Sequence, residues 1–159
     1  MSVHESQNKK SVLFVCLGNI IRSPTCEGLF RKLTNNQYVV DSAAVTEDDL
    51  NQHPSQHAIT VSKEHGFYIS NHISRLITKE DFERFNIIVS LEYSVQRELE
   101  RLKSRINPSS NALIVPFADR DIPNPWFCGY KDFVRMYAII EEKMNVFIKK
   151  YFPEVKIEN

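Results

Sequence analysis

The sequence predicts a single-domain α/β protein with three layers, in which helices cover both faces of a four-stranded parallel sheet. Short, nearly continuous apolar runs of strand length recur along the chain, and segments with apolar residues at helical spacing separate them. Strands that alternate with helices pair in parallel, because antiparallel neighbours are normally joined by short turns. The length of 159 residues suits one domain of this kind.

The first predicted strand and the first predicted helix enclose a short loop. Residues 11–16 read SVLFVC, a run that is typical of a strand buried on both faces. Ser23 is expected to cap the next helix and Pro24 to be its first residue, because both residue types are favoured at those positions. The apolar side of this helix is formed by Leu29, Phe30 and Leu33.

Three more strands and four more helices complete the predicted order. The strands are expected at 38–40, 87–89 and 112–115. The longer helices are expected at 54–64, 92–104 and 131–151. A short helix follows Thr78, which is expected to cap it, and Asp81 is placed to form a capping box with Thr78. The prolines at 116, 123 and 125 exclude regular structure between the last strand and the last helix.

Composition and termini narrow the function classes. We expect residues 1–10 to be a disordered polar tail, residues 11–152 to form the domain, and residues 153–159 to be a second tail. The 20 basic and 20 acidic residues cancel, which gives no general electrostatic affinity for nucleic acid or for an anionic membrane. No signal peptide or membrane span is recognisable, and the three cysteines are too few for a disulfide framework. These features predict a cytoplasmic protein.

The loop after the first strand carries the chemistry that the sequence predicts. Ligands of α/β folds bind beyond the carboxyl ends of strands, often at a helix N-terminus. Gly18 lets the chain curl tightly and Asn19 tolerates left-handed geometry, so that backbone amides can turn inward and hold an anion. Arg22 adds a positive charge with a planar fork that suits two phosphate oxygens. The predicted phosphate-binding residues are Leu17, Gly18, Asn19, Ile20, Ile21, Arg22 and Ser23.

Cys16 is the predicted nucleophile. A thiol surrounded by these amides and by Arg22 is expected to ionise readily, and the thiolate is the reactive form of cysteine. Ser23 is placed to donate a hydrogen bond to the sulfur when it leaves in a second step. A cradle of donors around three equatorial oxygens fits a phosphate monoester better than an acyl group.

The chain resembles the low-molecular-weight protein tyrosine phosphatase family from about Ser11 to Tyr151. The resemblance is carried by Cys-x5-Arg-Ser, read here as CLGNIIRSP, and by DSAA at 41–44, HG at 65–66, NHISR at 71–75, TKEDFERF at 78–85 and NPWF at 124–127. It implies that Cys16 forms a phosphocysteine intermediate while Arg22 binds the phosphoryl oxygens. It also implies a supporting hydrogen-bond network of Asn19, Ser23, Ser42 and His72, with no metal and no cofactor.

By the same resemblance the protein is expected to hydrolyse phosphotyrosine proteins or small aryl phosphates, to show acid phosphatase activity, and to bind inorganic phosphate. It is expected to be a monomer or a weak dimer. An arsenate reductase shares this scaffold but needs a relay of further cysteines, for which only Cys128 is available. Whether Cys128 instead forms a disulfide with Cys16 or is an unpaired loop thiol stays open, with the unpaired thiol favoured.

The most important departure from the family is Asn124. The family's general acid is an aspartate directly before a proline, whereas this chain has Asn124 before Pro125. An amide has no proton to donate, and loss of a positioned acid typically costs on the order of 10²–10⁴ in rate. The sequence therefore predicts reduced activity or, alternatively, a pseudophosphatase that binds without hydrolysis. Asp119 and Asp121 lie close in the sequence, but replacement of the acid by either is the less favoured interpretation.

Further departures concern the protecting cysteine and the substrate wall. Ile21 occupies a position where many members of the family carry a second cysteine. Asp48 stands where the family often has an aromatic residue, and Trp126 and Phe127 replace a frequent Tyr-Tyr pair. One aromatic wall is therefore expected to remain, and acidic peptides are expected to be repelled.

Overall fold

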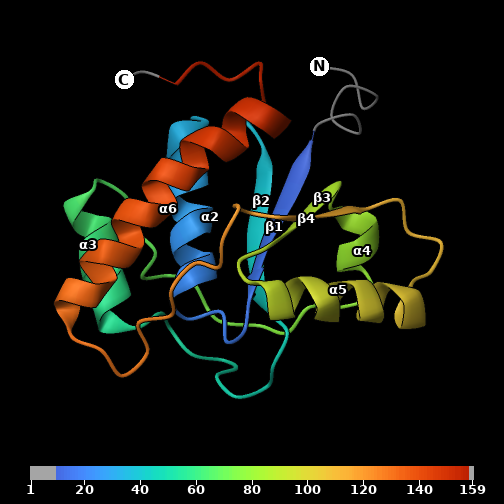
Figure 1. Ribbon diagram of the computed structural model, residues 1–159, viewed down its shortest axis with the longest axis horizontal. Coiled ribbons are helices and arrows are strands. Elements are labelled where there is room, and N and C mark those ends of the chain that lie inside the picture. The colour runs from blue at the N-terminus through green and yellow to red at the C-terminus, as the bar shows by residue number, and fades with distance from the viewer. Residues whose placement is uncertain (1–9, 158–159) are drawn as a thin grey trace.

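Four parallel strands form the central sheet of the computed structural model, which describes residues 10–157 (Figure 1). They are β1 (Ser11–Cys16), β2 (Val39–Ala44), β3 (Ile87–Ser90) and β4 (Leu113–Pro116), in the sheet order β2-β1-β3-β4. Every neighbouring pair is parallel, so the predicted α/β fold is confirmed. Residues 1–9 of the predicted N-terminal tail, and 158–159 at the other end, lie outside the described residues.

Helices cover both faces of the sheet. They are α2 (Arg22–Leu33), α3 (Gln56–Glu64), α4 (Asp81–Arg84), α5 (Tyr93–Ile106) and α6 (Tyr130–Tyr151). Figure 1 shows α2, α3 and α6 grouped on one side of the strands, and α4 and α5 on the other. All three layers of the predicted architecture are present.

Alternate residues of β1 enter two separate hydrophobic cores. Val12 and Phe14 pack in the core shared with α2, α3 and α6, whereas Leu13 and Val15 pack in the core shared with α4 and α5. Every residue of β1 is buried, as the apolar run in the sequence predicted. This central strand therefore places Cys16, its last residue, at the carboxyl edge of the sheet in the middle of the molecule.

Two differences from the predicted element boundaries change the role of a residue, whereas the other boundaries shift by at most two residues. Helix α2 begins at Arg22, so the prediction that Ser23 caps it is wrong, and Ile21 occupies the cap position without a side-chain bond. The Ser23 hydroxyl instead contacts Cys16 and Asn19. Strand β2 continues to Ala44, beyond the predicted residue 40, because it pairs with β1 along its whole length. Asp41 and Ser42, at which the strand was expected to end, are part of this strand.

Both ends of the described chain pack together at the edge opposite the loops of the site (Figure 1). Lys10 Nζ donates to the Tyr151 carbonyl at 2.9 Å, and Phe152 is completely buried. Val155 and Ile157, which belong to the predicted C-terminal tail, pack against the core. Between residues 10 and 157, no helix has both the length and the apolar composition needed to cross a bilayer.

Candidate active site

Three loops meet around a cavity of about 260 Å³ at the carboxyl end of β1. The first is the nucleophile loop (residues 16–22), the second is the acidic loop (residues 45–52), and the third is the late loop (residues 117–129). The lining residues are Cys16, Leu17, Gly18, Asn19, Ile20, Ile21, Arg22, Thr46, Asp48, Asp49, Asn124 and Trp126. The structure thus brings the predicted nucleophile, cation and substrate-wall residues of distant segments together.

Cys16 lies at the base of this cavity. Its side chain is almost fully buried, at 2% exposure. The backbone N–H of Asn19 donates to Sγ at 3.2 Å, and Ser23 Oγ lies 3.0 Å from Sγ. A backbone amide and a hydroxyl therefore contact the same sulfur and fix its position at the base of the cavity.

Arg22 is the first residue of α2, and its guanidinium is positioned by two contacts. Nη1 donates to the Ile122 carbonyl at 3.0 Å, and Nη2 donates to Glu92 Oε1 at 2.8 Å. The side chain is buried at 3% exposure. A guanidinium has five N–H donors, so donors remain for an oxyanion in the cavity. The amides of the first turn of α2 have no side-chain cap and add to this anion site.

Glu92 pairs with Arg22 and is not among the site residues that the sequence predicted. Its side chain makes no cap bond to α5 and pairs with Arg22 instead. A signal did exist in the sequence, because Glu92 lies two residues after the end of β3, at the carboxyl edge where ligands of α/β folds bind.

Asn19 joins the nucleophile loop to its support. Its backbone is left-handed, with φ at 62°. Its Nδ2 donates to Ser23 Oγ at 2.7 Å and to Ser42 Oγ at 3.0 Å. Its Oδ1 accepts from His72 Nε2 at 2.9 Å and from the Arg75 backbone N–H at 3.1 Å. The four residues predicted to support the loop are therefore one connected network.

A second shell of ion pairs lies behind this network. Ser42 Oγ donates to Glu27 Oε1 at 2.7 Å, and Arg31 pairs with Glu27 at 2.7 Å. Burial lowers the pKa of His72 from its usual value, while the nearby Glu27 and Asp41 carboxylates act in the opposite direction. The ligand atoms of Glu27, Asp41 and His72 lie within 4.8 Å of one another. Because Arg31 and Arg75 already neutralise the two carboxylates, this cluster is an ion-pair network and not a strong metal site.

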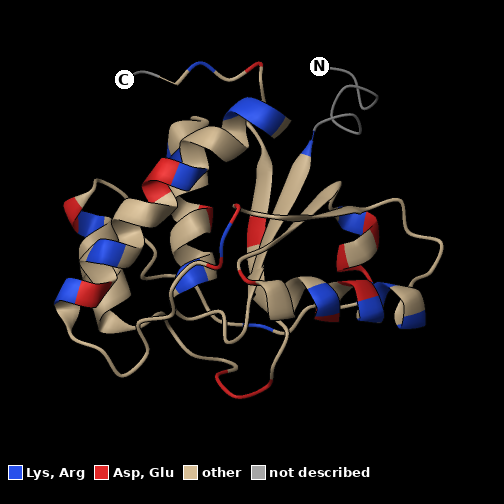
Figure 2. Cartoon of the chain, in the orientation of Figure 1, with Lys and Arg blue, Asp and Glu red and all other residues tan. Residues whose placement is uncertain are grey.

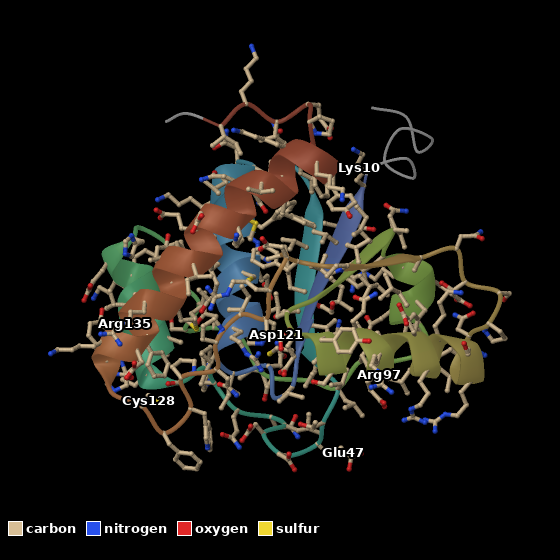
Figure 3. All side chains as sticks on the ribbon, viewed as in Figure 1. Lys10, Glu47, Arg97, Asp121, Cys128 and Arg135 are labelled. Atoms are coloured by element: carbon tan, nitrogen blue, oxygen red, sulfur yellow. The ribbon has the colours of Figure 1, made fainter. Side chains whose placement is uncertain are left out.

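The other two cysteines do not join Cys16 in the cavity. Burial raises the pKa of the Cys26 thiol well above its usual range, and the nearby Cys16 adds to this effect. Cys26 is therefore a protonated core residue. Cys128 is exposed, is not among the residues lining the cavity, and lies beside the start of α6 (Figure 3).

The late loop brings Asn124 and Trp126 to the cavity. Asn124 Oδ1 accepts the Trp126 backbone N–H at 3.3 Å, which leaves the Nδ2 group as the free polar end of the side chain. Phe127 is 93% exposed and does not line the cavity, although its ring packs against Trp126 with centroids 4.8 Å apart.

Neither nearby aspartate reaches the cavity in place of Asn124. Asp121 Oδ1 accepts the Tyr93 backbone N–H at 2.7 Å, so its carboxylate is bonded to the start of α5. Asp119 pairs with Lys143 at 3.0 Å, which holds the pKa of its carboxyl below the usual value. Neither residue is among the described residues that line the cavity.

Comparison with known proteins agrees with this geometry. The family model for low molecular weight phosphotyrosine protein phosphatase matches residues 11–156. The chicken enzyme of that name is 34% identical over 151 residues, which cover 89% of this chain and 95% of the relative. The solved structure of Vibrio vulnificus Wzb with benzylphosphonate has a TM-score of 0.79 and 28% identity, covering 90% of this chain and 99% of the other. The solved structure of DARP, a Drosophila arginine phosphatase, has a TM-score of 0.82 and 30% identity, covering 88% of this chain and 96% of the other.

The resemblance found in the sequence therefore extends over nearly the whole chain and over the fold. The buried thiol, the clamped arginine and the matched relatives lead to the same conclusion: the chain belongs to the low molecular weight phosphotyrosine protein phosphatase family.

Proposed function

We propose that this chain hydrolyses phosphotyrosine or other aryl phosphate monoesters through a phosphocysteine intermediate. The observation that carries the proposal is the placement of Cys16 Sγ, under an amide donor and a hydroxyl, at the base of a cavity that Arg22 also lines. Such pre-positioned donors stabilise the charge that develops on a transferring phosphoryl group. Inorganic phosphate fits the same cradle, and a cytoplasmic monomer or weak dimer is the form we expect.

The reaction has two displacement steps. The Cys16 thiolate attacks phosphorus, an S–P bond forms, and the P–O bond breaks so that its electron pair leaves with the aryl oxygen. Water then attacks phosphorus, the S–P bond breaks, and inorganic phosphate and the thiolate are released. Asn19 N–H and Ser23 Oγ stabilise the sulfur both as nucleophile and as leaving group.

We propose further that Asn124 limits this activity. The aryl oxygen must gain a proton as it leaves, and the Asn124 amide cannot supply one. The only carboxylates among the described residues lining the cavity are Asp48 and Asp49, which come from the opposite loop. The proton is then taken from water, so substrates with poor leaving groups are expected to react slowly.

The substitution Asn124→Asp tests this proposal. It should raise kcat on phenyl phosphate by roughly 10²-fold, because a positioned acid contributes 10²–10⁴. The gain on p-nitrophenyl phosphate should be much smaller, because nitrophenolate leaves without protonation. Cys16→Ser is the control for turnover at this site. An equal gain on both substrates, or none on either, would show that leaving-group protonation is not the limiting property.

The same asparagine favours one alternative, a pseudophosphatase that holds phosphotyrosine without releasing product. Rapid-mixing kinetics separate the two functions. A burst of phenol followed by slow phosphate release indicates an enzyme, whereas phosphopeptide binding without any phenol release indicates the pseudophosphatase.

An arsenate reductase is less well supported, because Cys26 is a core thiol and Cys128 lies outside the cavity lining. Because one solved relative is described as an arginine phosphatase, the substrate panel should include N-phosphoarginine.

A further inference from the structure

We propose that this cavity selects phosphotyrosine peptides that carry arginine or lysine beside the phosphotyrosine, with Asp48 and Asp49 as the specificity-determining residues. The inference rests on the proposed phosphatase function and adds a substrate class to it.

The charges around the cavity are unequally compensated. Its charged lining residues, among those the structure describes, are Arg22, Asp48 and Asp49. Arg22 is buried and already paired with Glu92, so it acts inward on the bound phosphate. The Asp48 and Asp49 side chains make no hydrogen bond or ion pair with any residue from 10 to 157. Two uncompensated carboxylates therefore remain at the mouth of the cavity.

The acidic loop that carries these carboxylates is held firmly against the nucleophile loop. The backbone N–H groups of Val45 and Thr46 donate to the carbonyls of Cys16 and Leu17, each at 3.1 Å. From the other side, Ser74 Oγ donates to the Asp49 carbonyl. Figure 2 shows the acidic stretch of this loop as a continuous red segment at the lower edge of the molecule.

The Asp49 carboxylate lies directly against the nucleophile loop. A Cβ atom added at Gly18 would lie only 2.5 Å from Asp49 Oδ2. The negative charge therefore stands beside the backbone that holds the phosphate, within reach of a residue that neighbours the phosphotyrosine. Asp48 is exposed, so its carboxylate can pair with a side chain that approaches from solvent.

An aromatic surface lines the cavity from the late loop. Trp126 is 42% exposed and Phe127 packs against it edge to face. A guanidinium or ammonium group is attracted both by carboxylates and by the faces of aromatic rings. A basic residue beside the phosphotyrosine therefore suits the mouth of the cavity. Aspartate or glutamate at the same position would be repelled by the negative charges of Asp48 and Asp49.

Three phosphopeptides that differ only in the residues flanking phosphotyrosine test the inference, with Arg, Ala or Glu at both flanks. Their kcat/KM should fall in that order, by about two- to fivefold for each ion pair gained or lost, as is typical of exposed pairs. The preference should weaken at high ionic strength, because salt screens exposed charges. Each value is divided by that of p-nitrophenyl phosphate for the same variant, so that changes in the chemistry itself cancel.

The variants Asp48→Asn and Asp49→Asn should each reduce the ratio between the Arg and Glu peptides. Glu47→Gln is the matched control, because it removes the same charge from the same loop at an exposed residue that does not line the cavity. Equal rates on all three peptides, or an equal effect of Glu47→Gln, would overturn the specificity and leave the phosphatase function standing.

If neither the wild-type protein nor any variant hydrolyses even p-nitrophenyl phosphate, the proposed function fails. The proposed specificity is then tested by peptide binding instead of by kinetics. Calorimetry on the Cys16→Ser protein then measures affinity for the same three peptides. The expected order is again Arg, Ala, Glu, and equal affinities would overturn the inference.

Discussion

Asn19 is the residue on which the geometry of the nucleophile loop depends most directly. Its backbone φ of 62° lies in the left-handed region, which asparagine tolerates better than most residues. The same residue supplies two side-chain donors and one acceptor oxygen to the network behind Cys16. One asparagine thus both allows the turn of the chain and holds it in place.

We predict that Asn19→Ala destabilises the protein by roughly 2–5 kcal/mol and lowers kcat/KM. The left-handed conformation costs an alanine about 1–2 kcal/mol, and the buried partners of the lost amide add about 1–3 kcal/mol. Denaturant unfolding and aryl phosphate kinetics measure the two effects.

Asn35→Ala is the matched control for this prediction. Asn35 has a φ of 51° but lies exposed after α2, without side-chain hydrogen bonds to residues 10–157. The Asn35→Ala substitution should lower the free energy of unfolding only by the cost of the left-handed conformation, about 1–2 kcal/mol, and leave kcat/KM unchanged. Equal losses for the two variants would mean that the Asn19 network contributes nothing.

At the scale of elements, helix α2 is the piece that connects the site to the core. Its first residue is Arg22, its first turn presents uncapped amides, and its later turns pack against the sheet and α6. Gly28 lies in the middle of this helix at a close approach. A Cβ atom there would lie 2.7 Å from the Phe67 ring and 2.8 Å from Ile69. The position of the anion site therefore depends on a glycine in the core.

We predict that Gly28→Ala destabilises the protein, although alanine favours helices. Overpacking of a core costs about 1–3 kcal/mol, whereas the gain in helix propensity is about 1 kcal/mol. A urea titration should show a net loss of up to about 2 kcal/mol. Gly129→Ala is the control, because a Cβ atom there has no neighbour within 4 Å. If Gly28→Ala proves stabilising, the contact with Phe67 and Ile69 is looser than the structure indicates.

At the scale of the whole molecule, the site and the packed chain ends lie at opposite edges of the sheet, although Cys16, Ile20 and Ile21 of the nucleophile loop belong to the hydrophobic core. The three loops of the site meet at the carboxyl edge of the sheet, and the packed termini lie at the opposite edge (Figure 1). At that edge Phe152 is fully buried, and the centroid of its ring lies 5.0 Å from that of Phe30 and 4.8 Å from that of Tyr38. Tyr38 and Lys10 both bond Glu154 above it.

We predict that Phe152→Ala lowers the free energy of unfolding by about 3–5 kcal/mol, as is typical of a buried aromatic ring, without changing kcat/KM of the folded protein. Val146→Ala, at a residue of α6 that is 61% exposed, should change stability by less than about 0.5 kcal/mol. Thermal unfolding and p-nitrophenyl phosphate kinetics measure both properties. A large loss of activity in the folded Phe152→Ala protein would show that the two edges of the sheet are coupled.

Local sequence was sufficient to predict the order of the elements, the parallel sheet and the nucleophile loop. Hydrophobic periodicity and the Cys-x5-Arg-Ser spacing are properties of neighbouring residues, so no three-dimensional information was needed. The prediction was weakest where a polar residue has a distant partner. The helix cap predicted at Ser23 was wrong, although the predicted contact of Ser23 with Cys16 is present. Strand β2 was expected to end after Val40, but it continues to Ala44, and Ser42 within it bonds Asn19 and Glu27.

The tertiary structure alone decided which residues complete the site. Glu92 reaches Arg22 across 70 positions of sequence, and the carboxylates of the acidic loop face Trp126 of the late loop around one cavity. Such pairings form because parallel strands bring their carboxyl ends to one edge of the sheet. No local sequence pattern shows which residues of distant loops will meet there. The sequence by itself predicted Cys16 as the nucleophile, the anion cradle around it and the loss of a general acid at Asn124. The fold determined the charges that surround them, because those charges come from loops that meet only after the sheet has formed.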